Sequence, residues 1–161
     1  MTLRSISQSR MLIAFIAIWF SQGHASAKDP QLVAGRCEAS SHTAEGPIGS
    51  DLTKRQSRFY CDTAVIIFLD DRPGHVLIQF VEKKSHSSSP LGFGGKIDGD
   101  GQIIQVEHAY LQPGKPIAVS EGYCKFFFQN QKMNGIACGM KLDEAGRRTT
   151  AIVGFTASPG Q

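Results

Sequence analysis

The sequence lacks long apolar segments and is almost without tryptophan. Its longest apolar run, from Met11 to Phe20, has ten residues, and its one tryptophan, Trp19, lies within that run. Because a helix needs about 20 apolar residues to cross the hydrocarbon core of a bilayer, no stable membrane span is expected. After the first 27 residues there is also no sustained 3.6-residue apolar pattern, which argues against a helical domain.

A strong excess of charge of one sign is missing as well. Two of the 17 basic residues and none of the 14 acidic residues lie in the first 27 positions, so the remainder carries a net charge of only +1. Lysine and arginine occur at most in adjacent pairs, such as Lys83-Lys84 and Arg147-Arg148. Nucleic-acid binding relies on clustered cationic side chains, so nucleic acid is not an expected partner.

Residues 1–27 have the features of a secretory signal peptide. Arg4 and Arg10 give a basic start, the apolar run follows, and Ala25-Ser26-Ala27 matches an A-x-A-like cleavage site. The alternative, an uncleaved membrane anchor, is less favoured because ten apolar residues are too few to span a bilayer. We expect cleavage to leave residues 28–161 as an exported protein, periplasmic or secreted. A chain of this length suits one domain with a single core.

Four cysteines remain in the exported part, and an even number in an oxidising compartment implies disulfides. Of the three ways to pair them, we predict Cys37 with Cys61 and Cys124 with Cys138, because each pair is close in sequence. Each such loop stabilises a folded domain by about 3 kcal/mol. A zinc site is not expected because no C-x-x-C spacing is present, and a cysteine nucleophile is not expected because no thiol is left over.

The stretch 121–142 predicts a β-hairpin that supports the second pairing. Cys124 and Cys138 both fall on the more apolar face of their alternating arms. A three-residue loop at 130–132 would place them directly opposite each other, close enough for a disulfide. Asn134-Gly135 is a competing signal for a two-residue type I′ turn, which would put Cys138 opposite Gln131. We favour the cysteine register, with Asn134-Gly135 forming a bulge.

The rest of the exported chain is a series of short alternating runs separated by Gly, Pro, Asp and Asn turns. This pattern predicts an all-β antiparallel meander of about eight strands, and we prefer an up-and-down barrel to a sandwich. It lacks the Gly-x-Trp expected near the first strand of a lipocalin. We expect a strand and a mobile loop over 28–57, forming one domain with the antiparallel β-region 58–157, and a disordered tail over 158–161.

Two groups of residues are candidates for a binding role. His108 and Tyr110 share an expected apolar face with Ile104 and Val106, so with Phe126 and Phe128 they would line a cavity, if the barrel has one. A core histidine with a hydrogen-bonded neighbour is the plainer interpretation of His108. The second group is a polar loop that a partner could meet. It consists of Ser85, His86, Ser87, Ser88 and Ser89.

These features favour a non-enzymatic module that binds or inhibits another exported or envelope protein through the loops 40–57 and 85–90. An alternative is a carrier that holds a small apolar ligand inside the barrel. A second alternative is an enzyme of unknown class. No motif supplies a catalytic residue, a metal cage or a phosphate cradle, so no cofactor or metal is predicted.

Mass spectrometry tests the export and disulfide predictions together. The protein recovered from the exporting compartment without reduction should have the mass of residues 28–161 less four hydrogens, because cleavage removes residues 1–27 and two disulfides form. Reduction should restore the four hydrogens. A mass that includes residues 1–27, or free thiols before reduction, would contradict the prediction.

Overall fold

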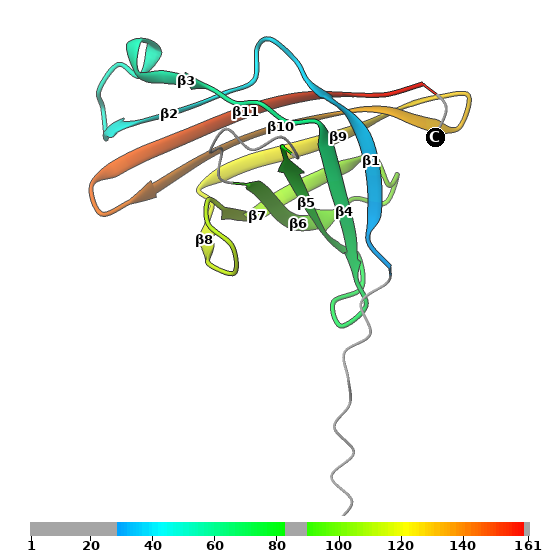
Figure 1. Cartoon of the computed structure of the whole chain (residues 1–161). Coiled ribbons are helices and arrows are strands. Elements are labelled where there is room, and N and C mark those ends of the chain that lie inside the picture. The colour runs from blue at the N-terminus through cyan, green and yellow to red at the C-terminus, as the bar shows by residue number, and fades with distance from the viewer. Residues whose placement is uncertain (1–28, 83–89, 160–161) are drawn as a thin grey trace, which may run out of the picture.

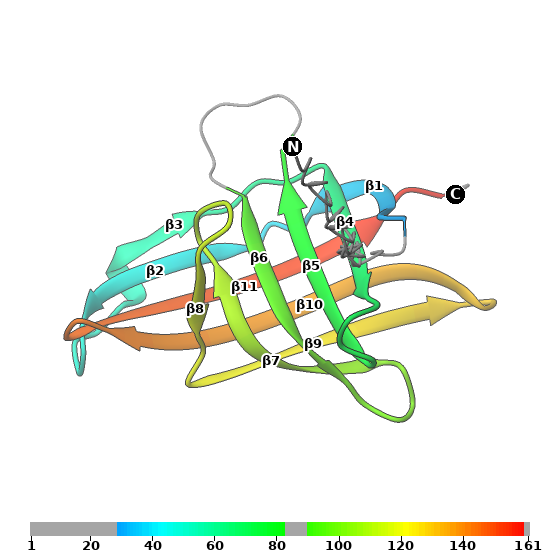
Figure 2. The ribbon, with the colours of Figure 1, turned by 90° about the horizontal axis from the view of Figure 1, so that it is seen from below.

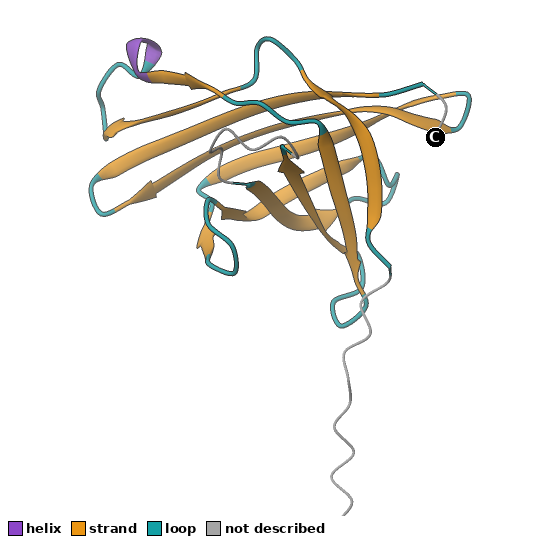
Figure 3. Ribbon diagram, in the orientation of Figure 1, coloured by secondary structure: helices purple, strands orange, loops and turns teal. Residues whose placement is uncertain are grey.

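A computed structural model describes residues 29–82 and 90–159 (Figure 1; Figure 3). The elements in chain order are β1 (Gln31–Cys37), β2 (His42–Pro47), the 3-10 turn η1 (Thr53–Arg55), β3 (Gln56–Arg58), β4 (Thr63–Leu69), β5 (His75–Val81), β6 (Leu91–Ile97), β7 (Ile103–Tyr110), β8 (Pro116–Ala118), β9 (Glu121–Gln129), β10 (Lys132–Glu144) and β11 (Arg147–Ala157). The expected signal peptide, the polar loop 85–89 and residues 160–161 of the expected tail lie outside the described residues.

Eight antiparallel strands form a closed ring, so the expected barrel is confirmed. The order around the ring is β1, β4, β5, β6, β7, β9, β10 and β11, and the pairing of β1 with β11 closes it. Apart from that closing pair, neighbours in the ring are neighbours in sequence except where β2 and β3, or β8, intervene. Figure 1 shows β2 and β3 extending the sheet alongside β11, and Figure 2 shows β8 lying beside β7.

The interior of the ring is filled by side chains that alternate inward along each strand. Phe80 lies near its centre, with its ring centroid 5.9 Å from that of Phe93 and 5.9 Å from that of Phe155. The other large side chains with almost no exposed surface are Ile66, Ile78, Ile104, Ile136, Leu142, Val76 and Val153. These residues come from six of the eight ring strands, so side chains from most of the ring share one core.

The β9–β10 hairpin has the register expected from its cysteines. Cys124 pairs directly with Cys138, their Cα atoms are 4.0 Å apart, and they form a disulfide. The predicted bulge is present between Met133 and Gly135. The expected three-residue loop is wrong: Gln129 pairs with Lys132, and the turn is formed by two residues, Asn130 and Gln131, which both have positive φ as a type I′ turn requires.

The segment 40–57, expected to be a mobile loop, instead contains β2, η1 and β3. β2 pairs with residues 147–152 of β11, and β3 pairs with β2. The sequence of β2, HTAEGP, has almost no apolar alternation. Its extended conformation depends on hydrogen bonding to β11 rather than on a pattern of its own, and tertiary pairing of this kind overrides local propensity.

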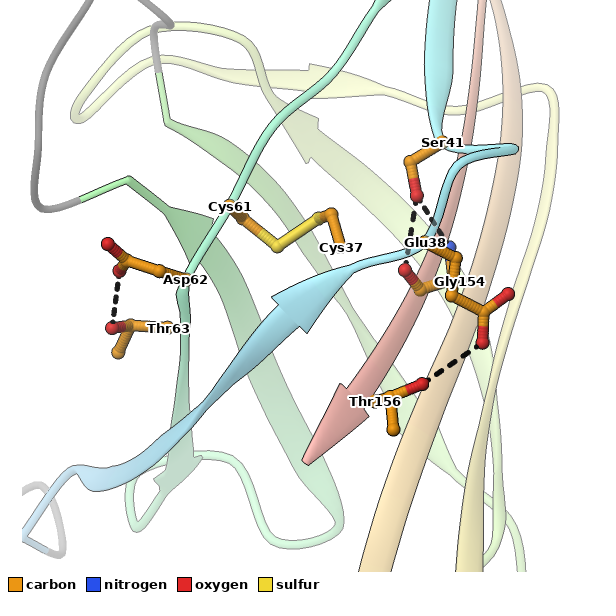
Figure 4. Close-up of a disulfide and its surroundings, with 8 residues drawn as sticks. All are labelled: Cys37, Glu38, Ser41, Cys61, Asp62, Thr63, Gly154 and Thr156. Atoms are coloured by element: carbon orange, nitrogen blue, oxygen red, sulfur yellow. Dashed lines mark hydrogen bonds between the residues drawn. A yellow bond between two sulfur atoms is a disulfide. The ribbon is translucent and has the colours of Figure 1, made fainter. Parts of the chain in front are cut away.

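β11 changes its neighbour at Gly154, and Ser41 bridges the change (Figure 4). Before this point β11 pairs with β2, and after it Phe155 pairs with Cys37 of β1. The buried Ser41 hydroxyl donates to the Gly154 carbonyl and accepts from the Gly154 amide, both at 3.1 Å. One side chain thus bonds both polar backbone groups of Gly154. The Glu38 amide also donates to the Gly154 carbonyl, at 2.7 Å.

The second predicted disulfide, Cys37 with Cys61, lies next to this junction (Figure 4). The Cα atoms are 5.0 Å apart, and the Cys37 amide donates to the Cys61 carbonyl at 2.9 Å. The bridge joins the end of β1 to the segment that leads into β4, so it ties the first ring strand to its neighbour. Both predicted pairings are therefore confirmed.

Replacing Ser41 with alanine should lower the free energy of unfolding by about 2 kcal/mol, because the part-buried amide of Gly154 loses its partner and the carbonyl loses one of its two donors. Ser50→Ala is the matched control: its hydroxyl donates to the Pro47 carbonyl on the exposed surface, and its loss should change stability by less than about 0.5 kcal/mol. Urea unfolding of the oxidised protein measures both. Equal effects would show that Ser41 does not hold the junction.

Candidate functional site

A β-bulge in β7 reverses the expected face of His108 and Tyr110. Gly95 pairs with Val106 and Gly94 pairs with His108, so Glu107 is an extra residue. Gly95 permits the bulge, because a Cβ there would lie 2.0 Å from the Gln105 carbonyl oxygen. An extra residue shifts the alternation by one position. Ile104 and Val106 are buried before the bulge and Ala109 is buried after it, so His108 and Tyr110 do not face the core.

The expected cavity lining is consequently not brought together. Tyr110 lies on the outside of the barrel, where its ring would meet a Cβ added at Gly92 or Gly94. The expected inward face is wrong for His108 and Tyr110. Phe126 does face inward, but it is buried in the packed core, while Phe128 is 50% exposed, with its ring centroid 6.3 Å from that of Phe126.

The outer face of the long strands carries an exposed apolar surface, here called the outer strip. It consists of Ile103 on β7, Tyr123 and Phe127 on β9, and Ile152 on β11, all at least 40% exposed. The register places Tyr123 beside Gly139, and Gly139 beside Ile152. Because glycine at 139 and alanine at 137 add little bulk, shallow hollows of about 370 and 430 Å³ separate the large side chains.

Ion pairs flank one end of the outer strip. Lys141 Nζ lies 2.7 Å from Glu121 Oε2, and Arg148 donates two hydrogen bonds of 2.8 Å to Asp143. Hydrogen bonding from Lys141 lowers the pKa of Glu121, and hydrogen bonding from Arg148 lowers the pKa of Asp143. These charges neutralise one another, so this end of the strip has little net charge.

The other end of the strip is cationic. Lys125 lies opposite Ile103 and between Tyr123 and Phe127 on the same face of β9, and its Nζ is 5.5 Å from the Phe127 ring centroid, an arrangement in which the ring face attracts the cation. Lys132 follows in the same hairpin, and Arg36 pairs across β1 and β11 with Thr156. Within residues 29–82 and 90–159 none of these three cations has an ion-pair partner. Glu38 is the nearby acidic group, and its carboxylate accepts a hydrogen bond from the Thr156 hydroxyl at 3.2 Å.

A second concave site lies at the end of the barrel, between the inner face of the β11–β2–β3 extension and the rim formed by β6 and β7. We call it the rim cleft, and its volume is about 500 Å³. Its lining combines arginines, hydroxyl groups and apolar side chains: Arg55, Arg58, Arg147, Glu45, Thr43, Ser57, Thr149, Ala44, Phe59, Pro90, Leu91 and Leu111. No pattern in the sequence predicts this site, because its arginines come from three different elements.

Local contacts hold the 3-10 turn that carries Arg55 against β2. The Asp51 carboxylate accepts bonds from the Thr53 amide and hydroxyl, at 2.9 and 2.7 Å, and these bonds lower the pKa of Asp51. The turn then packs on Gly46, where an added Cβ would lie 2.7 Å from Leu52 and 3.1 Å from Arg55. The small residue in β2 therefore lets the turn lie close enough for Arg55 to reach the cleft.

Comparison with known protein families, curated proteins and solved structures finds no match to this chain. The described part of the chain contains no cluster of three or more His, Cys, Asp or Glu side chains placed to hold a metal ion. In the same part, no helix has the length and apolar character needed to cross a membrane. The outer strip and the rim cleft are the two candidate binding surfaces of the described residues.

The ion pair between Glu121 and Lys141, at the edge of the outer strip, makes stability depend on pH. The folded-state pKa of Glu121 lies below its ordinary value of 4.5, so the pair stabilises the fold above that value, and this contribution is lost as the pH falls through the lowered pKa. Lys141→Gln should raise the midpoint of the Glu121 carboxyl titration, followed by carbon NMR, toward the ordinary value. A midpoint that does not move would contradict the ion pair.

Proposed function

We propose that this protein is an exported, non-enzymatic binding module that recognises another exported or envelope protein through the outer strip. The observation that carries the proposal is the group of four large apolar side chains exposed on one face of the sheet, on β7, β9 and β11, with the small Gly139 of β10 between Tyr123 and Ile152. Single exposed apolar residues are common on soluble proteins, whereas contiguous patches with a polar border are typical of interaction sites. Tyrosine is moreover one of the residue types enriched at the energetic centres of interfaces.

The rigidity of this surface supports the proposal. Tyr123 and Phe127 project from β9, which is paired on both sides, with β7 and with β10. The Cys124–Cys138 disulfide crosses the opposite face of the same two strands. A surface that is ordered before binding loses little conformational entropy when a partner docks, so more of the contact energy contributes to affinity.

The charges around the strip define the chemistry of the partner. After the two flanking ion pairs are formed, the cations Lys125, Lys132 and Arg36 outnumber the anion Glu38 at the Phe127 end. Complementary charge on a partner increases the rate of association and disfavours wrong partners. We therefore propose a partner with an apolar ridge bordered by acidic side chains.

The packed interior of the barrel bears on the alternative function as a ligand carrier. The interior of the barrel is occupied by the side chains of Phe80, Phe93 and Phe155, which favours a binding module over a carrier of an apolar ligand inside the barrel.

Two disulfides suggest an oxidising, extracellular environment, which is consistent with the proposed export to the periplasm or beyond it.

The double variant Tyr123→Thr, Ile152→Thr tests the proposed surface. Threonine keeps the β-branched character suited to strands but removes most of the exposed apolar area. Affinity for the partner captured from the exporting compartment, measured by calorimetry with the purified pair, should fall about 30-fold, as expected when one energetic centre of an interface is lost.

The matched control is Leu32→Thr, Ile48→Thr, which removes two apolar side chains of similar exposure away from the strip. This variant should bind like the parent protein. Equal losses in the two variants would refute the proposed surface. Sedimentation that instead shows a dimer of this chain, abolished only by the strip variant, would replace the proposed partner with a second copy.

A further inference from the structure

We propose that the rim cleft is a second binding site, for a small amphiphilic anion with a carboxylate or phosphate head and a short apolar body. The cleft and the outer strip lie on opposite faces of the extended sheet: Arg147 and Thr149 of β11 line the cleft, whereas Ile152 belongs to the strip. The inference therefore does not depend on the proposed protein-binding function.

The charge of the cleft favours an anion. Three arginines, Arg55, Arg58 and Arg147, line the cleft together with one acidic residue, Glu45. Arg147 Nε lies 2.5 Å from Glu45 Oε1, so this pair is neutral. Two cations remain, and guanidinium groups bind carboxylate and phosphate oxygens through paired hydrogen bonds.

Arg58 is held in place before any ligand binds. Its guanidinium donates to the Ala39 carbonyl and lies 5.1 Å from the centroid of the Tyr60 ring. Arg55 differs, because its side chain has no hydrogen-bond or ion-pair partner among the residues that the structure describes. Arg55 is therefore the arginine of the cleft that can turn to an anionic head, while Arg58 adds a fixed positive charge beside it.

The remaining lining indicates that the ligand also has an apolar part. Phe59 and Leu91 are almost fully buried at the floor of the cleft, and Leu111 is partly buried beside them. The hydroxyls of Thr43 and Ser57 lie at paired positions of β2 and β3. Small-molecule sites typically combine an apolar surface with a few polar groups that fix orientation, in volumes like that of this cleft.

Titration with octanoate, below its micelle concentration, tests the proposal on the purified protein. Octanoate carries both the anionic head and the apolar chain, octyl glucoside carries the chain without the charge, and acetate carries the charge without the chain. Octanoate should bind at one saturable site and at least about tenfold more tightly than either of the other two, because one charged hydrogen bond accounts for such a factor. Calorimetry or NMR shift titration measures all three.

Paired variants locate the binding. Arg55→Gln should weaken octanoate binding about tenfold, whereas Arg72→Gln, the same change in the turn at the opposite end of the barrel, should leave it unaltered. Glu45→Gln should strengthen binding about threefold, because it removes the one carboxylate and releases Arg147 from a surface ion pair. Asp71→Asn, again at the opposite end, is the control for that change.

Vesicles of phosphatidylglycerol distinguish a free anion from a lipid headgroup. If the protein binds octanoate but not the vesicles, the ligand is a soluble anion; if it binds octanoate and the vesicles, the ligand is a lipid headgroup. Either result supports a site for an amphiphilic anion. Equal affinity for octanoate and octyl glucoside would overturn the proposal, as would equal losses in Arg55→Gln and Arg72→Gln. If the variants unfold at the same temperature as the parent protein, their changes in octanoate affinity do not result from misfolding.

Discussion

Closure of the β-ring depends on one backbone junction, the point at which β11 leaves β2 and pairs with β1. Gly154 cannot be paired by both strands there, and an unpaired buried amide and carbonyl would be unfavourable. The Ser41 hydroxyl accepts from the Gly154 amide and, with the Glu38 amide, donates to the Gly154 carbonyl, and the Cys37–Cys61 disulfide holds the incoming strand beside it. The first and last strands of the ring can therefore meet.

The same junction gives the sheet two candidate binding surfaces. Because the first half of β11 is freed from β1, it can recruit β2 and β3, and the concave side of this extension forms the rim cleft against β6 and β7. The convex side continues the outer face of β9 and β10, where the outer strip lies. A ring of eight strands without the extension would have a packed core and a continuous surface, but no cleft of this kind at its rim.

Local patterns were sufficient where a residue and its partner belong to one hairpin. The pairing of Cys124 with Cys138 follows from alternation in two adjacent arms and a short turn, and even the bulge before Gly135 could be predicted from Asn134-Gly135. Local patterns failed at Tyr110, since one extra residue, Glu107, reverses the face of everything after it. They also failed at β2, whose polar sequence becomes a strand only because β11 offers it unpaired backbone groups.

For the candidate surfaces too, local patterns predict the direction of single side chains but not which side chains come together. The outward positions of Tyr123 and Phe127 follow from alternation in β9, but their union with Ile103 and Ile152 requires the register of four strands. Likewise, Arg55, Arg58 and Arg147 meet only after β2 has paired with β11. The sequence by itself determined the all-β class, the strand boundaries of most of the ring and the Cys124–Cys138 pair, because two-residue alternation and short turns are local; the Cys37–Cys61 pair followed from closeness in sequence. Ring closure, the bulged face of β7 and both surfaces were decided by the tertiary structure, because they depend on pairings between segments far apart in the chain.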